Sequence, residues 1–154
     1  MMQVTLSPLP RAEAAWLHAV AVPYFAELAP ALDPPAPGYF DKWWTEAGRA
    51  VHLISANTTP AGFAMIRQED GGHELSEFCI LPALRGTGIG AQAAALCLAL
   101  HPGPWTLGVA KALPGTARFW DRLLPSLACV TDLRRRPALT THQSHSYTFT
   151  VRGP

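Results

Sequence analysis

The segment that most constrains this chain is residues 77–100, EFCILPALRGTGIGAQAAALCLAL, where glycines at alternate positions separate two regular patterns. An apolar run typical of a strand precedes them, and an alanine-rich run typical of a helix follows. A helix N-terminus exposes unpaired N–H groups and the positive end of the helix dipole, so it attracts anions. Glycine removes the side chains that would keep an anion away from that backbone. Gly86, Gly88 and Gly90, with Arg85 beside them, therefore predict a pyrophosphate site, and close packing of a glycine-rich helix on a sheet is the structural alternative.

The size and charge of the chain limit its class. Its 154 residues suit one domain, 1–154, with a substantial core. Twelve basic and eleven acidic residues argue against a general binder of nucleic acid or membrane surfaces. No apolar run is long enough to span a membrane, and MMQVTLSPLPRAEAAW lacks the pattern of a secretory signal. Cys79, Cys97 and Cys129 each lie in an apolar run, which predicts reduced thiols in a cytoplasmic protein.

No metal site is predicted. The chain has no Cys-x-x-Cys pair, and His142 and His145 lie in a Thr/Ser-rich segment without an acidic neighbour. We expect both histidines to be surface residues.

Hydrophobic periodicity predicts a mixed α/β fold with helices on the faces of a sheet. Pro23 is expected to kink or split the first helix, because proline lacks the backbone donor. Gly48 is expected to end the second helix. The predicted strands are 2–7, 49–56, 61–68, 73–81, 104–111, 127–133 and 146–152, and the predicted helices are 11–28, 39–47, the glycine loop to 101, and 115–124.

Three kinds of phosphate loop compete for the glycine segment. A nucleoside-triphosphate loop needs Gly-Lys followed by Ser or Thr, but Ala91 and Gln92 follow Gly90. A dinucleotide fingerprint matches Gly86, Gly88 and Ala91, but the expected acidic residue about 20 positions later is missing from LGVAKAL. A dinucleotide-binding oxidoreductase is therefore the weaker alternative.

The third kind of loop fits best. RGTGIG has the form R-x-x-G-x-G and follows ILPAL, and this segment resembles the acetyl-coenzyme A loop of the GNAT superfamily of N-acetyltransferases. TPAGFAMI and PWTLGVAK are similar to the neighbouring strands of that family, and PGTARFWDRLL is similar to the helix that follows them. The resemblance implies a GNAT-like α/β (α+β) fold, with a mixed, mostly antiparallel, twisted sheet flanked by helices. It also implies acetyl transfer from acetyl-CoA to a primary amine, without a metal.

The resemblance implies a coenzyme site with three parts. Backbone amides of the glycine loop would hold the pyrophosphate, and the strand at residues 79–81 would pair with the pantetheine arm. A backbone N–H, that of Ile80, would support the thioester oxygen. The implied coenzyme-binding residues are Cys79, Ile80, Leu81, Arg85, Gly86, Thr87, Gly88, Ile89, Gly90, Ala91 and Phe119.

Acetyl transfer requires a neutral amine, but a lysine-like amine has a pKa of about 10.4, so the enzyme needs a base. Glu74 and Glu77 in HELSEF are the candidates for the catalytic base. They have opposite parity on a strand, so only one should face a given side unless a bulge intervenes. Glu74 has the family's spacing from the loop, whereas Glu77 is closer to the expected acetyl position, and solvated strand residues are the structural alternative.

Two family features are missing. The family's tyrosine acid is replaced here by Arg118-Phe119-Trp120, and an upstream asparagine is replaced by Leu113-Pro114-Gly115. Water would then protonate the thiolate. A catalytically degenerate acyl-CoA-binding module is therefore the second alternative.

The acceptor, a small-molecule or peptide amine, is expected at the first two helices. Tyr24, Tyr39 and Trp43 are the candidate contacts, because aromatic and acidic groups together suit a cation, although packing in the core is the competing interpretation. Residues 134–136, three arginines, fit either an adenosine phosphate or a solvated hairpin end. The final strand pair is a candidate edge for a homodimer.

Overall fold

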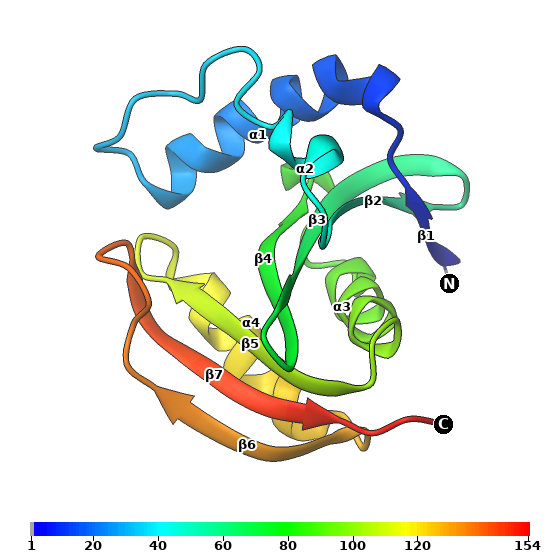
Figure 1. Ribbon diagram of the computed structural model, residues 1–154, viewed down its shortest axis with the longest axis vertical. Coiled ribbons are helices and arrows are strands. Elements are labelled where there is room, and N and C mark those ends of the chain that lie inside the picture. The colour runs from blue at the N-terminus through cyan, green and yellow to red at the C-terminus, as the bar shows by residue number, and fades with distance from the viewer. Residues whose placement is uncertain (1) are drawn as a thin grey trace.

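The computed structural model describes residues 2–154, and in them a seven-stranded sheet is flanked by helices (Figure 1). The strands are β1 (Val4–Pro8), β2 (Arg49–Ala56), β3 (Thr59–Glu69), β4 (Gly72–Ile80), β5 (Gly103–Ala110), β6 (Val130–Arg136) and β7 (Gln143–Val151). The helices are α1 (Ala14–Leu28), α2 (Lys42–Thr45), α3 (Ile89–Ala99) and α4 (Pro114–Ser126), with 3-10 turns at Arg11–Glu13 and Pro82–Leu84.

The sheet is mixed and mostly antiparallel, as predicted. Its spatial order is β1-β2-β3-β4-β5-β7-β6. Every neighbouring pair is antiparallel except β4 and β5, which run parallel. A parallel pair needs a crossover, and the glycine loop with α3 supplies it. β6 lies at the sheet edge, and its use in a homodimer stays a prediction.

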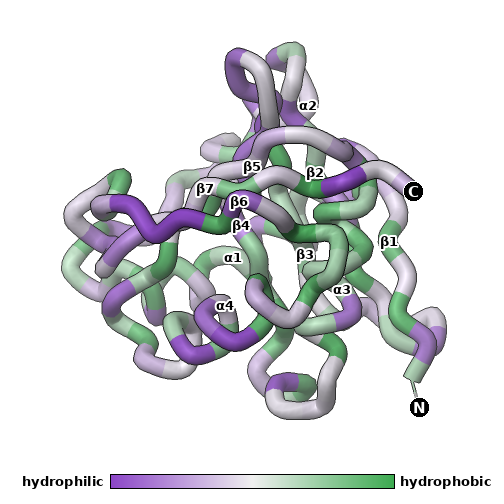
Figure 2. The backbone as a smooth tube through the Cα atoms, turned by 90° about the horizontal axis from the view of Figure 1, so that it is seen from below, coloured by the Kyte–Doolittle hydropathy of each residue, from purple (hydrophilic) through white to green (hydrophobic). Residues whose placement is uncertain are grey.

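Two hydrophobic cores lie on opposite faces of the sheet, and β3 contributes to both. Phe63 and Met65 pack under α1 and α2, whereas Ala64 and Ile66 belong to the core on the α3 and α4 side. Successive strand residues point to opposite faces, so a strand covered on both faces reads as one continuous apolar run. Figure 2 shows β3 and α3 as mainly apolar, and strongly hydrophilic stretches on α4.

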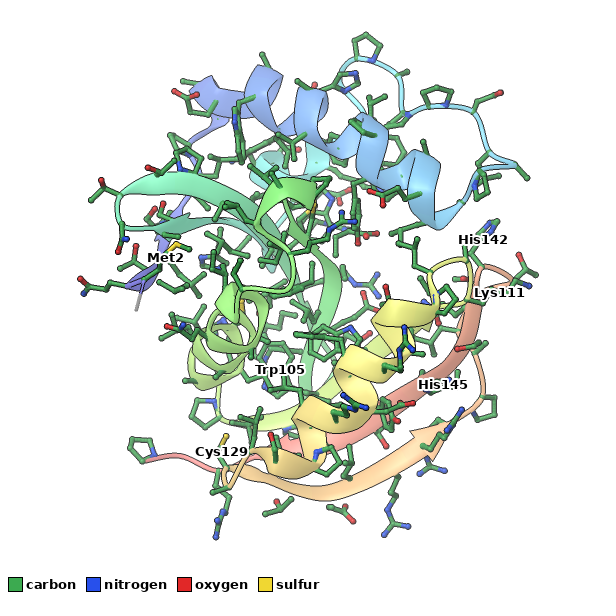
Figure 3. The ribbon with its side chains drawn as sticks, turned by 180° about the vertical axis from the view of Figure 1, so that it is seen from behind. Met2, Trp105, Lys111, Cys129, His142 and His145 are labelled. Carbon is green, nitrogen blue, oxygen red and sulfur yellow. The ribbon has the colours of Figure 1, made fainter. Side chains whose placement is uncertain are left out.

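The helices cover the two faces unequally. α4 packs against β5 and β7 on the face turned toward the viewer in Figure 3, and Trp105 of β5 is buried in that core. On the opposite face, α1 and α2 cover β2, β3 and β4, and no helix of the described residues lies in front of β5, β7 and β6 (Figure 1). Within residues 2–154, no helix is long and apolar enough to cross a membrane.

The first helix is not split at Pro23, which corrects one of the two predicted effects of this proline, whereas the kink stays a prediction. α1 continues through Pro23 from Ala14 to Leu28. Proline removes the hydrogen bond to the carbonyl four residues earlier, that of Ala19. Both Ala19 and Pro23 are exposed, so water can satisfy that carbonyl.

Other boundaries also differ from the predictions. α2 has only four residues, because extended backbone at Glu46 ends it before Gly48. β7 begins at Gln143, three residues earlier than predicted, and β6 ends at Arg136, three residues later. Pairing with β5 extends β7 back to Gln143, and pairing with β7 extends β6 to Arg136, beyond what the apolar pattern indicates.

Candidate functional site

β4 and β5 separate soon after they meet. Their parallel pairing is limited to residues 73–75 of β4 and 105–107 of β5. Among the described residues, no strand pairs with residues 76–80 on the edge facing β5. Leu81 donates its N–H to Ala61 on the β3 side, so the alternation of the backbone turns the N–H of Ile80 toward the free edge. An extended ligand can add to this edge as a strand would.

The glycine loop lies directly after the free edge. Gly86 and Gly88 have φ angles of 76° and 86°, and Gly88 is the N-cap of α3. Within residues 2–154, the N–H groups of residues 86–88 have no hydrogen-bond acceptor. A Cβ atom added at Gly86 or Gly88 would meet nothing within 4 Å, so this backbone faces open space. Free N–H groups at a helix N-terminus are suited to binding an anion.

Gly90 has a different role, because it permits close packing of α3 and α4. A Cβ atom there would lie 3.2 Å from the ring of Phe119. Phe119 also stacks on Phe78 of β4, with ring centroids 6.2 Å apart. A hollow of about 420 Å³ adjoins this contact, and its lining includes Ala91, Arg118 and Arg122. Phe119 therefore lies beside the glycine loop, and its contact with a coenzyme stays a prediction.

Arg85 is engaged within the protein. Its guanidinium makes two hydrogen bonds to the carboxylate of Glu27, at 2.9 and 3.0 Å, and a third to the carbonyl oxygen of Ile80 at 2.9 Å. The hydrogen bond to Glu27 raises the pKa of Arg85. Its backbone N–H donates to Pro82, so the free N–H groups of the loop begin at Gly86. Arg85 therefore ties α1 to the loop.

The two candidate bases, Glu74 and Glu77, lie on the same face of the sheet. Glu77 is opposite Met65, but Leu75 is opposite Ile66, so Ser76 is an extra residue in β4. Such a bulge reverses the alternation, and Glu74, opposite Arg67, comes to face the same side as Glu77. That side is the one covered by α1.

Glu77 is largely buried and has one hydrogen-bond donor. The Tyr24 hydroxyl of α1 donates to its Oε2 at 2.8 Å. Burial raises the pKa of Glu77 to about 7, the hydrogen bond from Tyr24 lowers it in part, and the nearby charge of Glu74 raises it. Burial also raises the pKa of Tyr24 well above 10, so Tyr24 stays a neutral donor. A carboxylate with a pKa near 7 can accept a proton at neutral pH and release it again.

Glu74 is held differently. It lies 3.3 Å from the guanidinium of Arg67, and its Oε1 accepts a hydrogen bond from Ser76 at 2.5 Å. The Glu74 carboxylate is therefore engaged by Arg67 and Ser76 within the protein. Of the two candidates, Glu77 has the environment of a base.

The comparisons with known proteins agree with this geometry. The sequence profile of the acetyltransferase (GNAT) family matches residues 13–123. This chain belongs to the GNAT family. No curated protein shows a significant sequence match to it.

Solved structures share the GNAT fold over nearly the whole chain. An acetyltransferase from Thermus thermophilus is 19% identical, with a TM-score of 0.74 and 97% of each chain covered. A domain from Methanocaldococcus jannaschii is 13% identical, with a TM-score of 0.76 over 98% of this chain and 100% of its own. Spermidine N-acetyltransferase from Vibrio cholerae, in complex with CoA and spermine, is 12% identical, with a TM-score of 0.70 over 97% and 96%.

The three aromatic candidates for amine binding lie in different environments in this GNAT chain. Tyr24 is buried against Glu77. Trp43 of α2 is only 6% exposed and packs in the core shared with α1, with the guanidinium of Arg49 over its ring. Tyr39 is 51% exposed. Tyr39 alone offers an open aromatic surface, and Tyr24 acts on Glu77.

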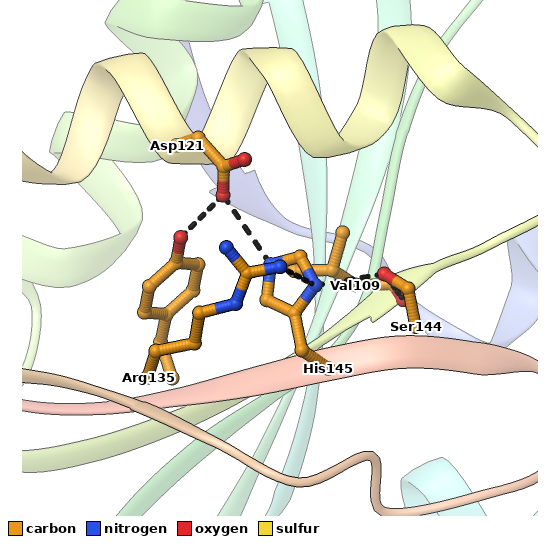
Figure 4. A network of polar contacts seen from close by, with 6 residues as sticks. Val109, Asp121, Arg135, Ser144 and His145 are labelled. Atoms are coloured by element: carbon orange, nitrogen blue, oxygen red, sulfur yellow. Dashed lines mark hydrogen bonds and ion pairs between the residues drawn. The ribbon is translucent and has the colours of Figure 1, made fainter.

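A polar network on the other face of the sheet corrects one sequence interpretation (Figure 4). His145 was expected at the surface but is 5% exposed, because β7 begins early enough to carry it under α4. Arg135 donates to its Nδ1 at 3.1 Å, which places the ring proton on Nε2, 3.3 Å from Oδ1 of Asp121. Tyr147 also donates to that oxygen.

The residues of this network come from α4, β6 and β7, so no local sequence motif predicts the network. The hydrogen bond from Tyr147 lowers the pKa of Asp121, and His145 and Arg135 lower it further. Within residues 2–154, no group of three or more His, Cys, Asp or Glu side chains is arranged to hold a metal.

Proposed function

We propose that this protein transfers an acetyl group from acetyl-CoA to a primary amine, with Glu77 as the general base. The observation that carries this proposal is the position of Glu77. It is a largely buried carboxylate with a pKa of about 7, next to the free edge of β4 and on the face reached from α1.

The free backbone groups support a bound coenzyme. The N–H groups of residues 86–88 and the N-terminus of α3 suit the pyrophosphate, and the free edge of β4 suits the pantetheine amides. Arg118 and Arg122 line the adjoining hollow and can contact further phosphate oxygens.

The chemistry follows from these positions. Glu77 accepts the proton of the amine, directly or through water, and the neutral amine attacks the thioester carbonyl carbon. The N–H of Ile80 supports the negative charge that develops on the carbonyl oxygen. The C–S bond then breaks, and the attacking nitrogen loses its second proton to water to give the amide. Water protonates the coenzyme A thiolate, since Phe119 and Trp120 occupy the place where the family's tyrosine acid is expected.

Ligand-induced thermal stabilisation tests the coenzyme part of the proposal. At a hundredfold excess over the dissociation constant, acetyl-CoA should stabilise the folded state by about 2.7 kcal/mol, and NAD and ATP should not. Gly88→Glu should weaken the effect, because it strains a backbone at φ 86° and places a negative charge at the anion site.

Gly71→Glu is the matched control for that variant. Gly71 also has a positive φ, 76°, and open space around its Cβ position, but it lies in the turn between β3 and β4. Stabilisation by acetyl-CoA should persist there. Selective stabilisation by NAD would favour the oxidoreductase alternative. Binding of acetyl-CoA without turnover of any amine would identify the degenerate acyl-CoA-binding module.

A further inference from the structure

The α1 face of the sheet carries a second groove where no helix of residues 2–154 covers it, separate from the coenzyme loop. It has a volume of about 720 Å³, and β3, β4, β5, β6 and β7 all contribute to it. Glu74 lines it, and the bulge at Ser76 puts Glu77 on the same face one step further along β4. An acceptor lying in this groove would therefore extend away from Glu77 across the sheet.

The two carboxylates of the groove are already engaged by one arginine, which offsets one of their two charges. Glu69 and Glu74 both lie 3.3 Å from the guanidinium of Arg67. Beside the glycine loop, Glu27 is likewise paired with Arg85. A polycation would gain less from these carboxylates than from free ones, since it would have to share or displace their arginine partners.

The cation at the far end of the groove is not neutralised. Within residues 2–154, Arg136 has no carboxylate partner, and its Nε donates only to Oγ1 of Thr148 at 3.5 Å. Its neighbours differ, because Arg134 is paired with Asp132 at 3.1 Å and Arg135 contacts His145. Arg136 lines the groove, whereas its two neighbours do not. The exposed charge at this end is positive.

We infer that the acceptor is an amine that also carries a carboxylate, with the amine at Glu77 and the carboxylate at Arg136. The inference rests on the proposed acetyl transfer and names its substrate class. A guanidinium binds a carboxylate through two parallel charge-assisted hydrogen bonds, so Arg136 selects for that group.

Sheet geometry sets the spacing of the two groups. Glu74 is opposite Thr106, and Thr106 is opposite Thr148, so Thr148 lies two strands from β4, or about 10 Å across the sheet. The side chain of Arg136 contacts Thr148 and therefore marks this position. Glu77 lies about 7 Å further along β4 than Glu74. The amine and the carboxylate are therefore about 12 Å apart, or about 8 Å if the arginine side chain turns inward. An α-amino acid is too short, and an extended ω-amino carboxylate with about six to eight methylene groups fits, at about 1.3 Å per bond.

The test is steady-state acetylation with acetyl-CoA and three series of acceptors, each of increasing length. The series are unbranched ω-amino carboxylates, their carboxamides and the matching diamines. We expect the lowest KM for the long amino carboxylates. Arg136→Gln should raise that KM about tenfold and leave kcat unchanged, because it removes one charge-assisted contact. It should not raise the KM of carboxamides or diamines.

Arg134→Gln is the matched control, because Arg134 lies on the same strand and is occupied by Asp132. It should leave every KM unchanged. A lower KM for diamines than for amino carboxylates would overturn the inference, as would an equal KM for amino carboxylates in wild type and Arg136→Gln.

Calorimetric binding of the long amino carboxylates to the CoA-loaded protein separates this inference from the proposed function. Binding that depends on Arg136 without acetylation of any amine would refute the function and support the groove assignment. Acetylation that does not depend on Arg136 would support the proposed function and refute the groove assignment. Absence of both turnover and binding would overturn both.

Discussion

The two faces of the sheet each carry a carboxylate that accepts a hydrogen bond from a tyrosine. The pKa values of these two carboxylates are nevertheless shifted in opposite directions. On the α1 side, Tyr24 donates to Glu77, and the pKa of Glu77 is raised to about 7. On the α4 side, Tyr147 donates to Asp121, and the pKa of Asp121 is lowered. A tyrosine partner therefore does not decide the outcome.

Access to water and the number of donors explain the difference. Burial is the main influence on Glu77, and one hydrogen bond offsets only part of it. Asp121 has a side chain that is 38% exposed, and it also faces His145 and Arg135. Glu77 is thus poised to exchange a proton, whereas Asp121 is a fixed anion that links α4 to β7.

The largest expected effect is on activity. Glu77→Gln should lower kcat/KM by about 10²- to 10⁴-fold, the usual contribution of a general base. Asp121→Asn should change kcat/KM by less than about threefold, since it lies on the other face. Initial rates of acetylation at pH 8 for the three proteins measure both effects. Equal losses in the two variants would remove the functional distinction between the carboxylates.

The next effect is on the pH dependence of stability. The pKa of Glu77 rises on folding from 4.5 to about 7, so its stabilising share is complete below pH 4.5 and is lost as the pH rises through 7. The full loss amounts to about 3 kcal/mol. Glu77→Gln should therefore gain stability relative to wild type between pH 5 and pH 8, as measured by urea unfolding.

Asp121 provides the comparison with opposite sign. Its pKa is lowered on folding from 3.8, so its stabilising share is present above that pH and is lost as the pH falls through the folded pKa. Asp121→Asn should therefore have a lower free energy of unfolding than wild type at neutral pH, and this difference should shrink only in acid. The same pH trend in both variants would contradict the comparison.

A smaller effect is expected for the tyrosine on the α4 side. Tyr147→Phe should lower the free energy of unfolding by about 1 kcal/mol, because it removes one hydrogen bond to a partly exposed carboxylate. The pH dependence of activity should stay as in wild type. Urea unfolding at pH 7 and a pH–rate profile are the two measurements, and a shifted profile would link the two faces.

The features that the sequence predicted well are local ones. Alternating glycines before an alanine-rich run predict the loop and α3, and the positive φ angles of Gly86 and Gly88 agree with that pattern. Apolar patterns predict most strands. β3, for example, is buried on both faces and is therefore a nearly continuous apolar run.

The features that escaped prediction depend on pairing between distant residues. The bulge at Ser76 arises from the register of β4 against β3, and parity alone placed Glu74 and Glu77 on opposite faces unless such a bulge occurred. Tyr24 and Glu77 are 53 residues apart, so their hydrogen bond leaves no mark in either segment. The burial of His145 follows in the same way from how far β7 extends along β5.

The pH dependence of kcat/KM for wild type, Tyr24→Phe and Glu77→Gln tests the central claim most directly. Wild type should show an acidic limb with a pKa of about 7. In Tyr24→Phe the limb should move to higher pH, by less than about one unit, because the hydrogen bond that favours the ionised carboxylate is gone. In Glu77→Gln the limb should disappear. A limb near pH 7 that persists in Glu77→Gln would show that another group is the base.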